Sequence, residues 1–212
     1  MSNQVADTIK EGVDSPDVDE LVKRAQDGNM EAFDELVQSF QVPIYNLALR
    51  MLNNTSDASD LTQEIFVKMY RSIAGFQGKS KFSTWLFMLA INTCRSGMRK
   101  LGRISSMEVG RLDQETVTDE GAIRHEPVDS GDHPDRILER KELASKVKEV
   151  IARLDEEFRL VVILRDVECL AYEEIAQVLD CSIGTVKSRL ARARMKLKDK
   201  LVREGLTCDA MT

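Results

Sequence analysis

Hydrophobic residues recur every three or four positions through most of the chain, which is the spacing of amphipathic helices. In the first half, this spacing predicts helices over residues 19–26, 30–52, 57–73 and 84–101. Pro43 falls inside the second of these segments. Because proline removes one backbone hydrogen bond of a helix, a kink or a break is expected there.

Small and polar residues mark the expected ends of these helices. Gly28 is expected to end the first one, since glycine commonly follows the last helical turn. Ser56 or Asp57 is expected to cap the third helix and Ser83 the fourth, because short oxygen-bearing side chains accept hydrogen bonds from the first backbone N–H groups.

The second half ends in two helices that lie very close together in sequence. Residues 135–154 and a short segment after Asp155 have apolar positions at helical spacing. Residues 172–179 and a helix from Ile183 are then separated by a three-residue turn, with Ser182 placed to cap the second helix. This pattern predicts a helix-turn-helix motif, whose second helix enters the major groove of DNA.

The segment between the two halves has no sustained apolar pattern. It is rich in acidic residues and contains Gly, Ser, Thr and Pro, so it cannot bury enough apolar surface to offset the entropy of ordering. We therefore expect an all-α chain of two small helical domains joined by a flexible acidic linker. The expected parts are a disordered acidic N-terminal extension (1–18), a first domain (19–103), the linker (104–134), a second domain (135–205) and a tail (206–212).

Composition narrows the class of protein. The 212 residues are 42% hydrophobic, which is enough for packed cores. The longest apolar run, residues 86–91, is too short to span a bilayer, and no secretion signal opens the chain. The four cysteines are scattered and only two histidines accompany them, so neither a disulfide framework nor a metal site is expected, and no cofactor is indicated. This usage favours a cytoplasmic location.

The net charge of the chain is distributed unevenly along the sequence. A net charge of −6 argues against a nucleic-acid-binding protein, because such proteins are usually basic. However, residues 1–20 carry −5 and residues 104–135 carry −7, whereas residues 21–103 carry +4 and residues 136–212 carry +2. The acidity therefore lies in the expected extension and linker, and each expected domain is positive.

Two basic segments carry the candidate nucleic-acid chemistry. Phe76, Phe82 and Trp85 lie among lysines and arginines, and such rings can stack unpaired bases at about 1–3 kcal/mol per base. The alternative is that the rings belong to the core, which is the preferred interpretation for Phe87. On the second helix of the pair, polar and basic residues lie outside the apolar stripe that is expected to be buried. They can therefore form hydrogen bonds with phosphates or base edges. The alternative is that these polar and basic residues form an ordinary solvated surface of the helix.

With both halves considered, the chain resembles the sigma-70 family of bacterial RNA polymerase sigma factors. It looks like the extracytoplasmic-function (ECF) group, which keeps only the second and fourth conserved regions. The resemblance covers both expected domains in the family's order. The matching segments are residues 32–37, 60–68, 82–86, 90–93, 172–176 and 184–190.

The resemblance implies a protein that binds core RNA polymerase and directs initiation at specific promoters, without catalysing a reaction. It implies that Asp60, Gln63 and Glu64 contact the clamp helices of the β′ subunit and that the second domain binds the β flap. An anti-sigma factor is a further implied partner.

The resemblance also implies two DNA-contacting sets, one in each domain. The set implied for melting and reading the −10 element is Phe76, Lys79, Lys81, Phe82, Trp85, Asn92, Arg95 and Arg99. The set implied for reading the −35 element is Ser182, Thr185, Lys187, Ser188, Arg189 and Arg192.

The chain departs from the family pattern just before the helix pair. Cys169 and Ala171 stand where members usually carry Gly and Ser. The helix that begins near Tyr172 therefore lacks its usual N-cap, which typically costs about 1 kcal/mol.

Two other functions are compatible with parts of the sequence. The first is a helix-turn-helix regulator whose N-terminal domain senses a ligand or dimerises. The second is an enzyme, but the only histidines, His125 and His133, fall in the linker, and no nucleophile has a base at motif spacing. A further hypothesis is that the acidic linker competes with DNA for the basic surfaces of the free protein.

Overall fold

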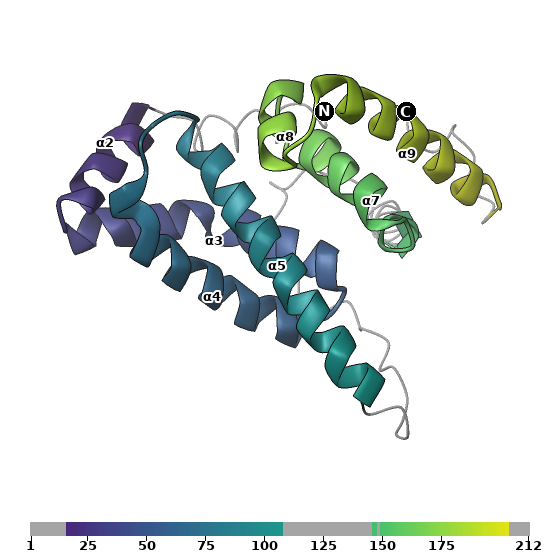
Figure 1. Ribbon diagram of the computed structural model, residues 1–212, viewed down its shortest axis with the longest axis horizontal. Coiled ribbons are helices and arrows are strands. Elements are labelled where there is room, and N and C mark those ends of the chain that lie inside the picture. The colour runs from purple at the N-terminus through teal and green to yellow at the C-terminus, as the bar shows by residue number, and fades with distance from the viewer. Residues whose placement is uncertain (1–15, 108–145, 148, 204–212) are drawn as a thin grey trace, which may run out of the picture.

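The computed structural model describes residues 16–107, 146–147 and 149–203, and this part of the chain contains helices and turns but no strand (Figure 1). The fold is therefore all-α, as predicted. Residues 1–15, 108–145, 148 and 204–212 lie outside the described residues. They include most of the expected extension, linker and tail, and the first part of the helix expected over residues 135–154.

Four α-helices form the N-terminal group. They are α2 (Pro16–Gln26), α3 (Met30–Leu52), α4 (Thr55–Ser72) and α5 (Phe82–Met107), with a 3₁₀ turn, η1 (Ile73–Gly75), after α4. All four predicted helices are confirmed. The last one continues beyond its predicted end near residue 101, and Figure 1 shows its C-terminal part projecting past the other helices.

Burial explains how α3 continues through its proline. Phe40, Ile44 and Leu47 flank Pro43 and are fully buried, so packing holds the turns on both sides of the missing hydrogen bond. The alternative of a break at Pro43 is therefore wrong. Where α4 crosses α5, glycine permits the close approach, because a Cβ added at Gly97 would lie 2.6 Å from Leu61 Cδ1.

The N-terminal caps are asparagines rather than the residues expected. Asn29 Oδ1 accepts a hydrogen bond from the backbone N–H of Ala32 at 2.8 Å, and Asn54 Oδ1 accepts one from Asp57 at 3.0 Å. The predicted caps at Ser56 or Asp57 and at Ser83 are therefore wrong. Ser83 is instead buried inside the first turn of α5.

The C-terminal group contains the helix-turn-helix. It consists of α7 (Glu156–Val162), a π-helical turn η2 (Ile163–Val167), α8 (Tyr172–Val178) and α9 (Ile183–Arg203). Its core includes Leu160, Ile163, Leu164, Ile175 and Val186, each fully buried. The predicted turn and the second helix are confirmed, and Ser182 Oγ accepts the backbone N–H of Thr185 at 3.1 Å as the expected cap.

The loop before α8 carries the family departure noted in the sequence. Cys169 has a φ of 56°, in the left-handed region that glycine adopts at no steric cost. Ala171 occupies the N-cap position of α8 and supplies no side-chain acceptor. Glu174 Oε2 accepts the backbone N–H of Ala171 at 2.7 Å, so one half of a capping box is present and the other is missing.

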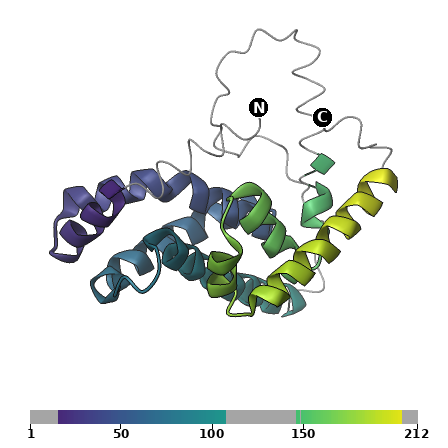
Figure 2. The same cartoon turned by 90° about the horizontal axis from the view of Figure 1, so that it is seen from above.

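The two groups pack against each other. α5 contacts α8, and α3 contacts α7. Figure 2 shows the C-terminal helices lying alongside the N-terminal ones, with α9 on the outside. The first helix of the helix-turn-helix therefore faces the helix that carries most of the expected −10 residues.

Candidate nucleic-acid interface

The N-terminal half of α9 presents most of the expected −35 residues to solvent. Lys187, Ser188 and Arg192 are exposed, whereas Thr185 and Arg189 are half-buried. The buried stripe of the same helix contains Val186, Leu190 and Ala193. This separation is what a helix needs if one face is to pack on α7 and α8 and the other is to meet DNA.

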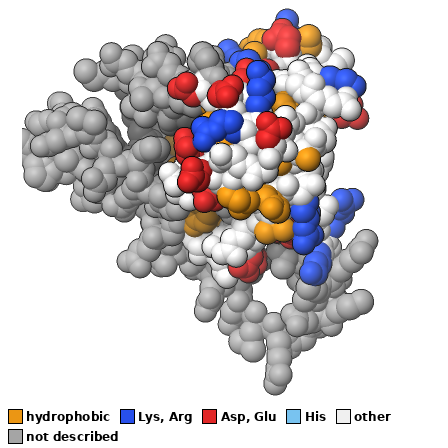
Figure 3. All heavy atoms as spheres, turned by 90° about the vertical axis from the view of Figure 1, so that its left-hand side faces the viewer, with side chains coloured by type: hydrophobic (Ala, Val, Ile, Leu, Met, Phe, Trp, Pro, Cys, Tyr) orange, Lys and Arg blue, Asp and Glu red, His pale blue; other side chains and the backbone are white. Residues whose placement is uncertain are grey.

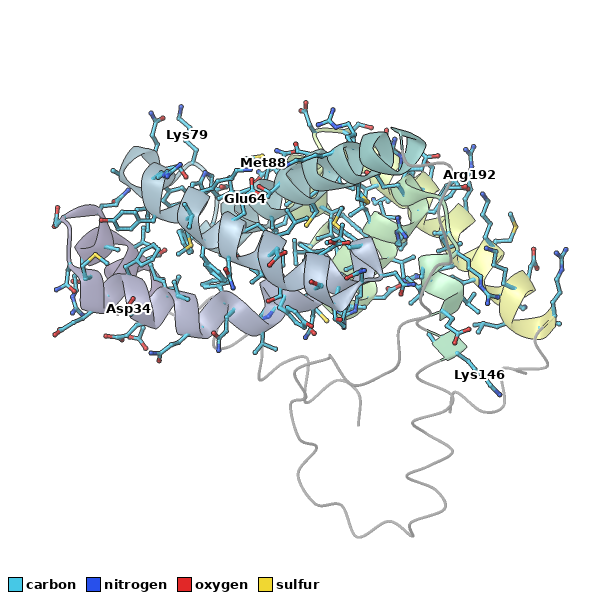
Figure 4. All side chains as sticks on the ribbon, turned by 90° about the horizontal axis from the view of Figure 1, so that it is seen from below. Asp34, Glu64, Lys79, Met88, Lys146 and Arg192 are labelled. Carbon is cyan, nitrogen blue, oxygen red and sulfur yellow. The ribbon has the colours of Figure 1, made fainter. Side chains whose placement is uncertain are left out.

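Three of the expected −35 residues also make contacts within the protein. The hydroxyls of Ser182 and Thr185 are 2.9 Å apart, and Ser182 caps the helix. The Lys187 ammonium lies 5.7 Å from the centre of the Tyr172 ring, which holds it over the helix-turn-helix. Arg192 makes no ion pair with a described residue, and Figure 4 shows its side chain extending from α9.

Several basic side chains of α9 pair with carboxylates of their own domain. Arg194 forms an ion pair with Asp166, and the hydrogen bond to that carboxylate raises the pKa of Arg194. Lys196 pairs with Asp155, and its hydrogen bond lowers the pKa of that carboxyl. Arg189 Nη2 lies 3.0 Å from Glu157 Oε2. The positive charge of the helix is thus partly balanced along the α7 side.

The three rings that were expected to stack bases, Phe76, Phe82 and Trp85, form one aromatic cluster. The Phe76 and Trp85 ring centres are 5.3 Å apart, and each lies within 5.6 Å of Phe82. Phe82 is only 2% exposed and also packs edge-on against Phe40 at 5.5 Å. The expectation that Phe82 offers its ring to a base is therefore not met in this conformation, because the ring fills the core. Phe76 and Trp85 are half-buried.

The remaining expected −10 residues lie along the loop before α5 and on α5 itself. Lys79 and Asn92 are exposed, and Figure 4 shows Lys79 near the opposite end of the molecule from Arg192. Arg99 donates to Ser96 Oγ at 3.3 Å on the same helix. The side chains of Lys81 and Arg95 instead form ion pairs with carboxylates of the C-terminal group. The sequence analysis did not predict these ion pairs.

The expected polymerase contacts lie together on the outer face of α4. Asp60, Gln63 and Glu64 are all exposed, and Glu64 pairs with Lys68 one turn later at 2.7 Å. The same helix exposes Val67 and Tyr70, with Tyr70 54% exposed.

Neither residue shares the helical spacing of the buried positions Ala58, Thr62, Ile65 and Met69, and the sequence analysis assigned neither of them a role. Figure 3 faces the end of the molecule that carries α2 and shows hydrophobic side chains gathered beside charged ones. Exposed apolar side chains that are rimmed by polar residues often mark protein-binding surfaces.

A buried ion pair joins α3 to the segment before α8. Arg50 Nη1 lies 3.2 Å from Glu168 Oε1, and the Glu168 side chain is only 8% exposed. Burial raises the pKa of Glu168 to about 7 despite the nearby guanidinium, and burial also lowers the pKa of Arg50. Desolvation therefore outweighs mutual attraction for both partners.

The described residues offer little other chemistry. They contain no cluster of His, Cys, Asp and Glu suited to a metal ion. None of their helices combines the length and the apolar content needed to cross a membrane. Burial raises the pKa of the Cys94 thiol to about 12, which makes this thiol a poor nucleophile.

Comparison with known sequences assigns both groups of helices. The family described as Sigma-70 region 2 matches residues 36–104, and the family described as Sigma-70, region 4 matches residues 144–197. The chain is 39% identical over 182 residues to the RNA polymerase sigma-H factor of Pseudomonas aeruginosa, covering 82% of this chain and 89% of that one. It is 34% identical over 202 residues to the ECF RNA polymerase sigma-E factor of Escherichia coli, covering 95% and 97%.

Two solved structures share the fold. CnrH, solved in complex with the cytosolic domain of CnrY, aligns with a TM-score of 0.62 at 26% identity, covering 86% of this chain and 96% of that one. The sigma factor RpoE of Bartonella quintana, solved with the anti-sigma factor NepR, has a TM-score of 0.62 at 25% identity, covering 80% and 96%. With regions 2 and 4 matched in order and relatives aligned over nearly the whole chain, this protein belongs to the ECF group of sigma-70-family RNA polymerase sigma factors.

Proposed function

We propose that this ECF sigma factor uses the surfaces described above to bring core RNA polymerase to its promoters. The exposed face of α9 reads the −35 element as duplex, through Lys187, Ser188, Arg189 and Arg192. The observation that carries this assignment is the division of α9 into a buried apolar stripe and an exposed polar and basic face directly after the turn. In the helix-turn-helix geometry, the first residues of the second helix reach the base edges.

The −10 element is assigned to the loop before α5 and the exposed side of that helix. Phe76 and Trp85 provide ring surfaces, and Lys79, Lys81, Asn92, Arg95 and Arg99 provide donors for phosphates and bases. Phe82 supports the two rings from the core rather than touching DNA. A ring surface flanked by cations suits an unstacked single strand, because every base has a face that can stack.

The outer face of α4 is assigned to the polymerase. Asp60, Gln63 and Glu64 are proposed to meet the β′ clamp helices, and region 4 the β flap. We further propose an anti-sigma factor as a partner, since CnrH and the Bartonella RpoE were each solved with another protein, in one case an anti-sigma factor. The chain is proposed to act in the cytoplasm and to catalyse no reaction itself.

Run-off transcription tests the proposal directly. Purified core polymerase is combined with the full chain and a template library that carries randomised −35 and −10 elements. We expect start sites downstream of one recurring pair of elements, and their loss when Arg192 is changed to alanine. A regulator that merely binds DNA would give no initiation with core polymerase alone, and that result would reject the assignment.

A further inference from the structure

A glutamine at the end of α2 is bonded to the start of the loop that leads into α5. Gln26 Nε2 donates one hydrogen bond to the carbonyl oxygen of Ile73 at 2.9 Å and another to the carbonyl oxygen of Phe76 at 2.8 Å. The two acceptors are 47 and 50 positions further along the chain, so these bonds join separate elements. α2 contacts the turn η1, and Figure 1 shows the segment between α4 and α5 passing beside α2.

The chemistry at this point requires a side chain with two hydrogens on one nitrogen. Backbone carbonyl oxygens only accept hydrogen bonds, so the amide nitrogen of Gln26 faces them rather than its oxygen. The N–H of Phe76 in turn donates to the Ile73 carbonyl at 3.0 Å. Both backbone polar groups of Phe76 are therefore bonded, and one of the two bonds comes from Gln26.

The loop after Phe76 has little backbone support of its own. Residues 77–80 make no backbone–backbone hydrogen bond with a described residue. Gly78 has a φ of 67°, in the left-handed region that glycine adopts at no steric cost. The exposed Lys79, a proposed donor for the −10 element, follows it directly. The loop is thus held at its two ends, by Gln26 at its start and by the first turn of α5 after it.

We propose that Gln26 is a positioning residue for −10 recognition, which fixes the backbone of Phe76 and so presets the ring surface before DNA binds. This inference rests on the proposed function of the rings. The Phe76 ring lies 5.3 Å from that of Trp85 and 5.6 Å from that of Phe82, so a shift of the Phe76 backbone changes the whole aromatic cluster. A surface that is ordered in advance loses less conformational entropy when it binds its ligand.

The test uses Gln26→Met in holoenzyme assembled from purified core polymerase and the full chain. Methionine keeps the approximate length and the helix propensity of glutamine but has no N–H to donate. The matched control is Gln38→Met, the same substitution at an exposed position of α3. Circular dichroism and a melting curve establish that each variant is folded at the temperature of the binding measurements.

Two fluorescent DNA probes separate the two promoter elements. One is a single strand with the −10 sequence recovered by run-off transcription, compared with a scrambled strand, and the other is a duplex with the recovered −35 sequence. We expect Gln26→Met to lower the affinity for the −10 strand about fivefold, because two hydrogen bonds that order the loop are lost. Its affinity for the −35 duplex should stay within about twofold of the unmodified chain, as should both affinities of Gln38→Met.

A double-mutant cycle distinguishes positioning from a general attachment of α2. Phe76→Ala is measured alone and together with Gln26→Met, on the −10 strand. If Gln26 acts through Phe76, the two losses are not additive, and Gln26→Met should cost less than about twofold once the ring is absent. If Gln26 only attaches α2 to the rest of the helices, its loss should be the same in both backgrounds.

Three results would overturn the inference. They are an unchanged −10 affinity of Gln26→Met, an equal loss on the −35 duplex, and full additivity with Phe76→Ala. A failure of the proposed function gives different results. If Phe76→Ala leaves the affinity for the −10 strand unchanged, or if the template library gives no initiation, the assignment of the ring surface is wrong and the positioning role is rejected with it.

Discussion

At the level of single residues, Cys169 holds a backbone conformation that costs a non-glycine residue about 1–2 kcal/mol, because its Cβ approaches the following carbonyl. Its thiol makes only a 3.9 Å contact with the Val167 carbonyl in return. Cys169→Gly is therefore expected to raise the free energy of unfolding by about 1 kcal/mol in urea titration. Cys169→Ala is the control, since it keeps the Cβ and should give no gain.

A substitution at the N-cap of α8 is expected to give a second, independent gain in stability. Ala171 leaves the backbone N–H of Glu174 without a side-chain acceptor, although Glu174 already completes the reciprocal half of the box. Ala171→Ser supplies the missing oxygen and should stabilise the chain by about 0.5–1 kcal/mol, measured as a higher urea midpoint. Ala171→Val, which has no acceptor, should show no such rise. Equal midpoints for Ser and Val would contradict the capping argument.

At the level of elements, the helices could be predicted because each has one buried face, and burial imposes a regular spacing on the sequence. Helix ends were less predictable, since Asn29 and Asn54 compete locally with several other short polar residues for the cap position. Helical spacing also placed Phe82 near the basic residues without revealing which way its ring points. That direction depends on Phe40, which comes from another helix.

The recognition helix allows a prediction about DNA binding that is separate from stability. Arg192 is exposed and makes no ion pair with a described residue, so Arg192→Ala should change the free energy of unfolding by less than about 0.5 kcal/mol. Its effect on −35 duplex binding by the holoenzyme should be a loss of about 1–3 kcal/mol, measured by fluorescence anisotropy. Lys198→Ala, further along α9, removes the same charge and should cost less. Equal losses would indicate only a general charge contribution.

At the level of the whole molecule, the packing of the N-terminal helices against the C-terminal helices could not be predicted from the sequence. Arg50 and Glu168 are separated by more than a hundred positions, and neither residue stands in a motif that points to the other. Glu156 and Glu157 lie in the first turn of α7, where the helix dipole alone favours acidic residues. The structure adds an ion pair for each of them, with Arg95 of α5 and Arg189 of α9.

The buried pair of Arg50 and Glu168 makes the stability of the folded chain depend on pH. The pKa of Glu168 is raised from 4.5 to about 7, so between these values the folded chain holds a proton that the unfolded chain releases. The stabilising contribution is therefore complete below about pH 4.5 and is lost as the pH rises through 7. From pH 5.5 to 7.5, the free energy of unfolding should fall by up to about 2 kcal/mol more in the unmodified chain than in a Glu168→Gln variant, which cannot ionise. Urea titrations of both chains at the two pH values measure this difference, with Glu173→Gln as an exposed control that should follow the unmodified chain. A parallel pH response in all three proteins would show that Glu168 does not titrate in this range.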